Sequence, residues 1–418
     1  MRTETWPSPA HLGMFCAVAD CGSISDAARL VHRSQPAVSQ GLRTVELALG
    51  AQLFQRSSSG VRLTAAGVIA EPRCRRLLEQ LSGGLANLRR GRSRGDTANL
   101  RAISFTQLHA LNAVVERGSF SAAAQALGQA RASVHRAVRT LEAALAVPLF
   151  EHTSFGLGST RAATELARCA ALASSEWQQA RAEVAALSGG DRGITVIGAM
   201  PLARSVLVPR TVLAMLARYP RHRVAILDGH YDGMLAELRR GSADLLVGAL
   251  REPAPGADVV QEHLFDDPLA LVMRAAHPLA RRRRPGVAQL ASYPWIVARP
   301  GAPLHAQFDA LFAGAGQPMP VSTIECNSMD AARALLLASD CLMLSSEQQL
   351  HHELRAGELR VLPHPLGPRV RAIGLTLRRD WRPTAAQQFL LDTLRLEARR
   401  GGGGLARSVS LAVAERPR

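Results

Sequence analysis

The sequence predicts a chain of several domains, in which two small and mostly helical modules precede an α/β domain. The chain has 418 residues, whereas one domain typically holds about 100–200. A segment of the first hundred residues recurs 96 residues later. From Gly193 onward, short apolar runs alternate with amphipathic stretches, which is typical of alternating strands and helices.

Composition excludes several classes of protein. Hydrophobic residues make up 47% of the chain and charged residues 20%, which argues against wholesale disorder. No apolar stretch approaches the ~18–20 residues that span a bilayer, and the first residues lack the apolar core of a secretory signal. Six cysteines without a Cys-x-x-Cys pair argue against a disulfide scaffold or zinc module. We therefore expect a cytoplasmic protein without a membrane partner.

The charge is strongly positive, at +16, and all 50 basic residues are arginine. Residues 1–100 hold 13 arginines against 7 acidic residues, so this segment is the most basic long stretch. Such an excess favours a polyanionic partner for the N-terminal part. An arginine-rich surface that only faces solvent is the alternative.

The internal repeat is the sharpest signal. Residues 22–28 (GSISDAA) recur as 118–124 (GSFSAAA), and 13 of 35 positions are identical between 22–56 and 118–152. This similarity far exceeds chance and indicates a duplicated unit.

Each copy is expected to form three helices and two strands. In copy one, Gly22 ends the first helix, while Ser23, with Asp26 as a capping-box partner, begins a short second helix. Ser34 can cap a third helix that carries Pro36 in its first turn. Residues 53–56 and 61–63 then form a two-stranded wing. A short helix, a tight turn and a helix with outward polar residues make a helix-turn-helix.

This arrangement suits duplex DNA, because an α-helix fits the major groove and wing arginines can reach phosphates. A small helical bundle with a polar face is the alternative. The candidate DNA-contacting residues of copy one are Ser34, Gln35, Ala37, Ser39, Gln40, Arg43, Arg56 and Arg62.

The runs 34–40 (SQPAVSQ), 53–56 (LFQR) and 63–67 (LTAAG) closely resemble the winged helix-turn-helix of LysR-type transcriptional regulators. Modules are therefore expected at 8–70 and 103–163, although a member of that family normally carries one. Copy two departs from the pattern, so it either contacts DNA with another sequence preference or serves dimerisation. Its candidate DNA-contacting residues are Arg131, Ser133, His135, Arg136 and Arg139.

Each module leads into a helix. Residues 71–99 are predicted to form a first linker helix, interrupted by Gly83 and Gly84, and a basic tether. Residues 164–190 carry a heptad stripe that resembles the family's linker helix, which pairs two subunits, so a homodimer or tetramer is expected. Packing of the stripe within one chain is the alternative. The stripe comprises Leu166, Ala170, Ala173, Trp177, Ala180, Val184 and Leu187.

The C-terminal half reads as an α/β domain. Strands at 194–198, 224–227 and 244–250 alternate with helices at 204–218 and 231–240, which indicates a parallel sheet. Motifs such as 218–220 (RYP), 244–248 (DLLVG) and 277–279 (HPL) make residues 192–397 resemble the family's effector-binding domain, which is similar to periplasmic binding proteins. The resemblance implies two α/β lobes around a cleft that binds a small organic metabolite.

By that resemblance, the cleft residues follow the strands of the two lobes. Met200 stands where many relatives have a hydroxyl residue, so Arg204 or Arg299 could hold a ligand's charge instead. The candidate effector-binding residues are Met200, Pro201, Leu202, Arg204, His230, Ala249, Leu250, Arg299, Pro300, Gly301, Asn327 and Ser328.

Nucleotide-binding and nucleophile-elbow motifs are missing from the sequence, so we expect no enzyme activity, cofactor or metal. Residues 401–418 are predicted to be a disordered tail. The predicted function is a sequence-specific, effector-controlled transcriptional regulator of the bacterial cytoplasm and nucleoid, with double-stranded DNA, a second copy of itself and RNA polymerase as partners. The alternative is a small-molecule-binding protein whose helical modules mediate assembly.

Overall fold

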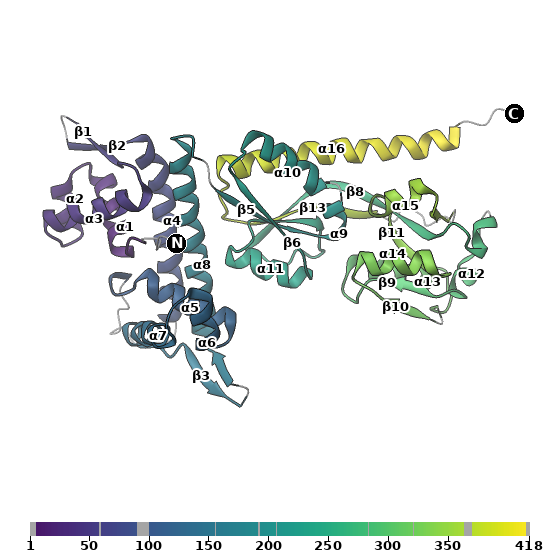
Figure 1. The fold of residues 1–418 in the computed structure, drawn as a ribbon, viewed down its shortest axis with the longest axis horizontal. Coiled ribbons are helices and arrows are strands. Elements are labelled where there is room, and N and C mark those ends of the chain that lie inside the picture. The colour runs from purple at the N-terminus through teal and green to yellow at the C-terminus, as the bar shows by residue number, and fades with distance from the viewer. Residues whose placement is uncertain are drawn as a thin grey trace. The chain divides into compact units, whose positions relative to one another are not determined.

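A computed structural model of the chain describes residues 6–57, 60–89, 100–154, 156–190, 193–205, 207–282, 284–320, 322–362 and 370–414. These residues form two compact units that divide at residue 194, with the short segments 221–223 and 239–242 counted in the first (Figure 1). Among the described helices, none combines the length and apolarity needed to cross a membrane. Most of the predicted basic tether, from 90 to 99, lies outside the described residues.

The first module has the predicted three helices and wing. The Ser23 side chain accepts a hydrogen bond from the Asp26 amide at 3.3 Å, and Ser34 caps the third helix. The Asp26 carboxylate pairs with Arg29, so the predicted capping box does not form. The elements are α1 (Pro9–Cys21), α2 (Ile24–Leu30), α3 (Gln35–Leu49), β1 (Phe54–Ser57), β2 (Gly60–Leu63) and α4 (Ala65–Arg89).

The second module repeats this order after a short 3-10 helix. In both modules a glutamate side chain of the third helix accepts a hydrogen bond from the backbone amide of the leucine that precedes the wing. The distance is 2.9 Å from Leu53 to Glu46 and 2.8 Å from Leu149 to Glu142. The elements are η1 (Leu100–Ala102), α5 (Phe105–Arg117), α6 (Phe120–Leu127), α7 (Arg131–Leu145), β3 (Phe150–Thr153), β4 (Gly156–Ser159) and α8 (Arg161–Ala186).

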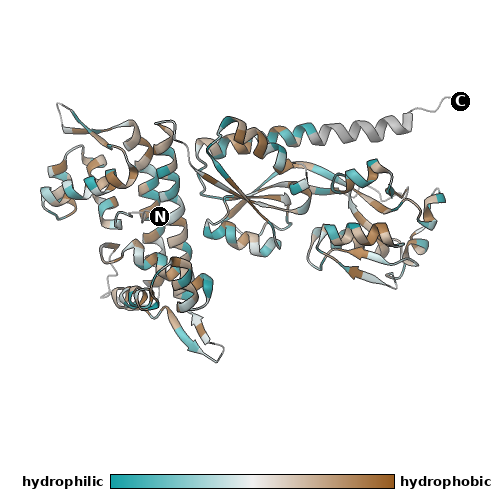
Figure 2. Cartoon of the chain, viewed as in Figure 1, coloured by the Kyte–Doolittle hydropathy of each residue, from teal (hydrophilic) through white to brown (hydrophobic). Residues whose placement is uncertain are grey.

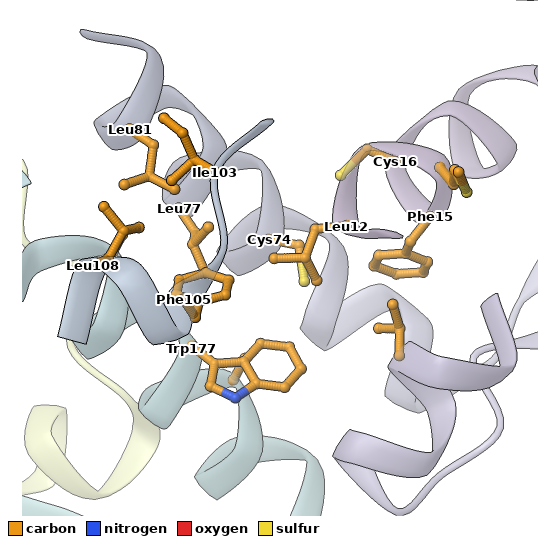
Figure 3. Close-up of a cluster of buried hydrophobic side chains, with 14 of the residues drawn as sticks. Leu12, Phe15, Cys16, Cys74, Leu77, Leu81, Ile103, Phe105, Leu108 and Trp177 are labelled. Carbon is orange, nitrogen blue, oxygen red and sulfur yellow. The ribbon is translucent and has the colours of Figure 1, made fainter. Parts of the chain in front are cut away.

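The linker helices α4 and α8 lie side by side within one chain (Figure 1). One hydrophobic core runs through both modules and both linker helices. Figure 3 shows Leu12 of α1, Leu77 of α4, Phe105 of α5 and Trp177 of α8 in this shared core. The two modules are therefore parts of one folded body.

This packing corrects the prediction that the stripe of α8 pairs two subunits. Six of its seven residues, from Leu166 to Val184, are at most 4% exposed within the single chain, whereas Leu187 is 53% exposed. The stripe instead contributes to the core that α4 and α8 share, which is the alternative left open by its spacing. The sequence could not decide this, because a heptad stripe has the same spacing whether its partner is in the same chain or another.

Helix α4 also runs through Gly83 and Gly84 without the predicted interruption. A Cβ added at Gly84 would lie 2.9 Å from Cβ and Sγ of Cys169, whereas one at Gly83 would meet no described atom within 4 Å. Gly84 is therefore the small residue that lets α4 and α8 approach closely.

The second unit contains a nine-stranded sheet that both of its lobes share. In the first lobe β5 and β7 are parallel, β13 pairs antiparallel with β7, and α10 packs against α16. Figure 2 shows these central strands coloured as hydrophobic. The elements are β5 (Ile194–Ala199), α9 (Pro201–Ser205), α10 (Leu207–Arg218), β6 (Arg223–Leu227), α11 (Tyr231–Arg240), β7 (Leu245–Ala249), β13 (Val370–Arg378) and α16 (Ala385–Ala414).

The second lobe is built on β9, which pairs in parallel with β10 and β11. The long strand β8 joins the lobes, because its first part pairs with β13 and its last part with β11 and β12. The elements are β8 (Val259–Arg274), η2 (Pro278–Arg281), α12 (Val287–Ala291), β9 (Trp295–Val297), α13 (Pro303–Ala313), β10 (Thr323–Glu325), α14 (Met329–Ala338), β11 (Leu342–Ser346), η3 (Glu347–Leu350), α15 (His351–Ala356) and β12 (Leu359–Val361).

Two sequence predictions for this unit are wrong in detail. The helix expected over 204–218 forms as α9 and α10 instead, with residue 206 outside the described residues. The tail expected to be disordered over 401–418 continues α16 as far as Ala414, and 415–418 are not described. Four glycines lower helix propensity by about 1 kcal/mol each but do not forbid the conformation.

Candidate functional site

Helix α3 of the first module presents a polar face opposite its buried side. Gln35, Gln40 and Arg43 are exposed, whereas Val38 and Val45 are buried in the shared core. Ser34 is also exposed, and Ala37 and Ser39 are half-buried at the edge of this face. The arrangement leaves amide and guanidinium groups free to meet base edges, as a recognition helix requires.

The wing of the first module is anchored to the helix-turn-helix. The amide of Val61 donates to the carbonyl of Gly22 at 2.9 Å. A Cβ at Gly60, whose φ is 132°, would lie 2.3 Å from that same carbonyl oxygen, so only glycine fits. The anchored strands hold Arg56 and Arg62 exposed on opposite faces of the wing, because Arg62 pairs with Gln55.

The recognition helix of the second module is more cationic. Arg131, Arg136 and Arg139 are all exposed, as are Ser133 and His135. Arg139 pairs with Glu142 of the next turn at 2.9 Å. The five candidates thus share one solvent-facing side of α7, like their counterparts on α3.

The second wing differs from the first. The amide of Leu157, which is the equivalent of Val61, makes no backbone hydrogen bond to Gly118 in the described structure. A Cβ at Gly156 would meet no atom of the described residues within 4 Å. A cavity of about 280 Å³ lies between α6, α7 and this wing. It is lined by Ser119, Phe120, Ser121, Arg131, His135, Arg139, Glu142, Phe150, His152 and Leu157.

The first-lobe effector candidates follow β5, β6 and β7. Met200 is half-buried, its amide donates to the Val247 carbonyl at 2.9 Å, and its side chain lies over Gly248, where an added Cβ would be 2.1 Å from it. Arg204 forms an ion pair with Asp228 at 2.5 Å, so its charge is partly neutralised. The other first-lobe candidates range from buried to exposed: Pro201, Leu202, His230, Ala249 and Leu250.

The second-lobe candidates stand at the equivalent ends of β9 and β10. Arg299, Pro300 and Gly301 connect β9 to α13. Asn327 is exposed. The side chain of Ser328 caps α14 by accepting a hydrogen bond of 3.3 Å from the backbone amide of Ala331. The carboxyl ends of parallel strands are the usual ligand-binding edge of such sheets.

Sequence reasoning missed Arg251, which directly follows the candidate Leu250. The guanidinium of Arg251 lies 4.2 Å from the centre of the Tyr231 ring, and its buried Nη1 has no hydrogen-bond partner among the described residues. The side-chain amide of Gln261 makes two hydrogen bonds of 2.9 Å with the Arg251 backbone, since it accepts from the amide and donates to the carbonyl. Burial lowers the pKa of this guanidinium. Its position at the end of a buried strand was the signal that could have singled it out.

The junction of the lobes carries a second missed group. The Asp267 carboxylate, which is 1% exposed, accepts hydrogen bonds of 2.6 Å from Ser346 and from Arg371. Arg371 also donates to Gln349 at 3.2 Å. These residues are far apart in the sequence, so no local pattern could predict their contact.

A third missed group joins α4 and α8, and we call it the interhelix lock: Arg73 and Arg76 of α4 with Glu176, Gln179 and Glu183 of α8. The Arg73 guanidinium donates to Glu183 at 2.9 Å, to Glu176 at 3.0 Å and to Gln179 at 2.6 Å. Arg76 donates to the second oxygen of Glu176 at 3.0 Å. Burial by itself lowers the pKa of Arg73, but the bonds and charges of Glu183 and Glu176 outweigh burial and raise it.

The comparisons with known proteins match both parts of the chain. The family model described as "Bacterial regulatory helix-turn-helix protein, lysR family" matches residues 9–68 and again 105–164. The model "LysR substrate binding domain" matches residues 188–399, about half of the chain. The chain belongs to the LysR family of transcriptional regulators. The two matches of the first model confirm the duplicated module predicted from the repeat.

Relatives agree with this membership. The HTH-type transcriptional regulator GalR of Pseudomonas putida is 31% identical over 391 residues, which cover 93% of this chain and 97% of GalR. PcaQ of Agrobacterium fabrum is 28% identical over 70% of this chain and 94% of PcaQ. A full-length OxyR variant of Pseudomonas aeruginosa has a TM-score of 0.51 at 20% identity, over 70% of this chain and 95% of that one. CbnR has a TM-score of 0.51 at 21% identity, over 71% and 99%.

This LysR-family chain is a transcriptional regulator with helix-turn-helix DNA-binding modules and a substrate-binding effector domain. The solved structures share its fold. The family membership therefore favours the regulator over the alternative of an assembly protein. The relatives in these comparisons are regulators rather than enzymes.

Proposed function

We propose that this regulator binds its operator through α3 and the anchored wing of the first module. Gln35, Ser39, Gln40 and Arg43 would contact base edges, and Arg56 and Arg62 would contact phosphates. The observation that carries this proposal is the anchored wing, because the Val61–Gly22 hydrogen bond sets the wing arginines relative to α3. The base contacts of α3 and the wing arginines, which extend from opposite faces of the wing, then belong to one rigid module.

The second unit would respond to a small organic effector at the strand ends of its two lobes. The ligand would act by binding one arrangement of the lobes more tightly than another, because only differential affinity shifts such an equilibrium. Arg251 is a better candidate than Arg204 for holding an anionic group of the ligand. Arg204 already has Asp228 as a partner, whereas Nη1 of Arg251 has none within the described part of the chain.

Equilibrium binding to a footprinted operator duplex at several salt concentrations tests the DNA contacts. Arg56→Ala should weaken binding to all duplexes alike and reduce the slope of log K against log salt by about one. Arg43→Ala should reduce discrimination against point-mutated operators by about tenfold or more, because a base contact is lost.

Arg360→Ala is the matched control, since it removes one exposed arginine of β12, outside the helix-turn-helix modules. If Arg43→Ala and Arg56→Ala both keep the wild-type salt dependence and the wild-type discrimination between operators, then α3 and the first wing do not recognise the operator. Failure of the wild-type protein to bind any duplex sequence-specifically would remove the proposed operator contacts altogether.

The remaining expectations complete the proposal. We expect the regulator to act without enzymatic turnover, at the bacterial nucleoid, and to contact RNA polymerase at the promoter. Oligomers would form through surfaces other than the α8 stripe, which is occupied within the chain.

A further inference from the structure

The first unit already contains a pair of reader modules, and the pair belongs to one core. Trp6 contacts both Phe105 of α5 and Trp177 of α8, with ring centroids 4.9 and 6.1 Å apart. Figure 3 shows Leu77 and Leu81 of α4 beside Ile103 and Leu108 of the second module. Since side chains from both modules interdigitate, the spacing of α3 and α7 is set by a packed core rather than by a flexible tether.

The interhelix lock makes this pairing specific for α4 with α8. In the repeat, Arg73 corresponds to Cys169, and Glu176 and Glu183 correspond to Gln80 and Asn87. Two α4 helices in the same geometry would place Arg73 opposite neutral side chains, and two α8 helices would bury the glutamates opposite a thiol. Either pairing of two identical helices would leave a buried charge without a partner. Both pairings are therefore less stable than the pairing of α4 with α8.

The two recognition helices differ at equivalent positions. Gln35, Ser39 and Gln40 of α3 correspond to Arg131, His135 and Arg136 of α7. Glutamine pairs in a bidentate manner with adenine, whereas arginine does so with the O6 and N7 atoms of guanine. The same docking geometry therefore presents two different base preferences.

The wings differ in the opposite sense. Arg56 and Arg62 of the first wing correspond to His152 and Gly158 of the second, and Gln55 corresponds to Glu151. The second wing has lost both arginines and gained a carboxylate, so it offers little attraction to phosphates. Both recognition helices keep one equivalent arginine, Arg43 and Arg139. Module one carries its further arginines on the wing, whereas module two carries its further arginines, Arg131 and Arg136, on the recognition helix.

We infer that one chain reads a non-palindromic operator made of two unlike half-sites, an adenine-containing one under α3 and a guanine-containing one under α7. This inference rests on the proposed function. A regulator that pairs two identical readers would instead require two like half-sites, since operator symmetry mirrors protein symmetry.

The test selects duplexes from a randomised pool with the full-length protein and sequences them. We expect a consensus of two unlike halves at a fixed spacing. Gln40→Ala should lower base preference in one half by about tenfold, and Arg136→Ala should do the same in the other half only. Arg136→Gln should change the preferred base from guanine toward adenine, a gain that an unfolded variant cannot produce. Arg360→Ala is the charge control and should leave both halves unchanged.

A consensus built only of like half-sites, or a consensus that Arg136→Ala and Arg136→Gln leave unaltered, would overturn the inference while leaving module one as the reader. Absence of any consensus with wild-type protein would instead refute the proposed function, on which the inference depends. Co-expression separates one chain from two: Gln40→Ala and Arg136→Ala chains together should not restore wild-type discrimination. Restoration would show that the two readers of one operator come from different chains and would overturn the inference.

Discussion

Replacing Arg73 by Met tests the interhelix lock most directly. The Arg73 side chain is 7% exposed, and its partners Glu176 and Glu183 are 8% and 23% exposed. Removing one partner of a buried ion pair typically costs about 3–5 kcal/mol, because the remaining charge stays buried. Arg76 keeps one bond to Glu176, and Glu183 can turn toward water. Both facts place the expected loss near the lower limit, at about 3 kcal/mol.

Hydrogen exchange of the α4 and α8 amides, followed by mass spectrometry of the full-length protein, measures this loss where it occurs. A change of about 3 kcal/mol in the opening free energy corresponds to an approximately 150-fold loss of protection. Arg75→Met is the matched control, since Arg75 lies in the same helix but is 42% exposed. Its pairs with Asp20 and Glu71 should contribute about 1 kcal/mol or less. Equal and small effects of the two substitutions would refute the reasoning.

Two further predictions concern stability. Gly83→Ala should stabilise the first unit by up to about 1 kcal/mol through helix propensity. Gly84→Ala should destabilise it, because the added Cβ would lie 2.9 Å from Cβ and Sγ of Cys169. Thermal unfolding measures both effects, and midpoints that shift in the same direction in the two variants would contradict the prediction. Burial raises the pKa of Asp244 from 3.8 to about 6. Because the folded state binds this proton more tightly than the unfolded state, the resulting contribution to the free energy of unfolding is fully present below about pH 4. It is lost as the pH rises through 6. Asp244→Asn should therefore gain up to about 3 kcal/mol relative to wild type between pH 4 and 7; parallel pH profiles of unfolding would exclude the effect.

Local features of the sequence were sufficient to predict each module. Ser34 and Pro36 mark the start of α3, and the repeat with Glu46 and Glu142 in register indicated that the second module folds like the first. Alternating apolar runs likewise predicted β5, β6 and β7 of the second unit. These signals are short-range, since caps, glycine turns and hydrophobic periodicity act within a few residues.

Contacts between residues far apart in the chain could not be predicted from the sequence. The Arg73–Glu183 pair joins residues 110 positions apart, and the Asp267–Arg371 pair joins residues 104 apart. Neither separation is encoded in a local pattern, because the contact depends on how whole helices and strands pack. The continuation of α16 past residue 400 was missed because the glycine run favours a break only through intrinsic propensity.

The sequence by itself determined the two helix-turn-helix modules, the polar faces of their recognition helices and the α/β character of the second unit. Only the tertiary structure decided that the α8 stripe is covered by α4 of the same chain. The physical reason is that a heptad stripe specifies a partner of matching shape but not its origin. Gly84 and the buried charges of Arg73 and Glu176 supply that missing information, and they do so only when the two helices are side by side.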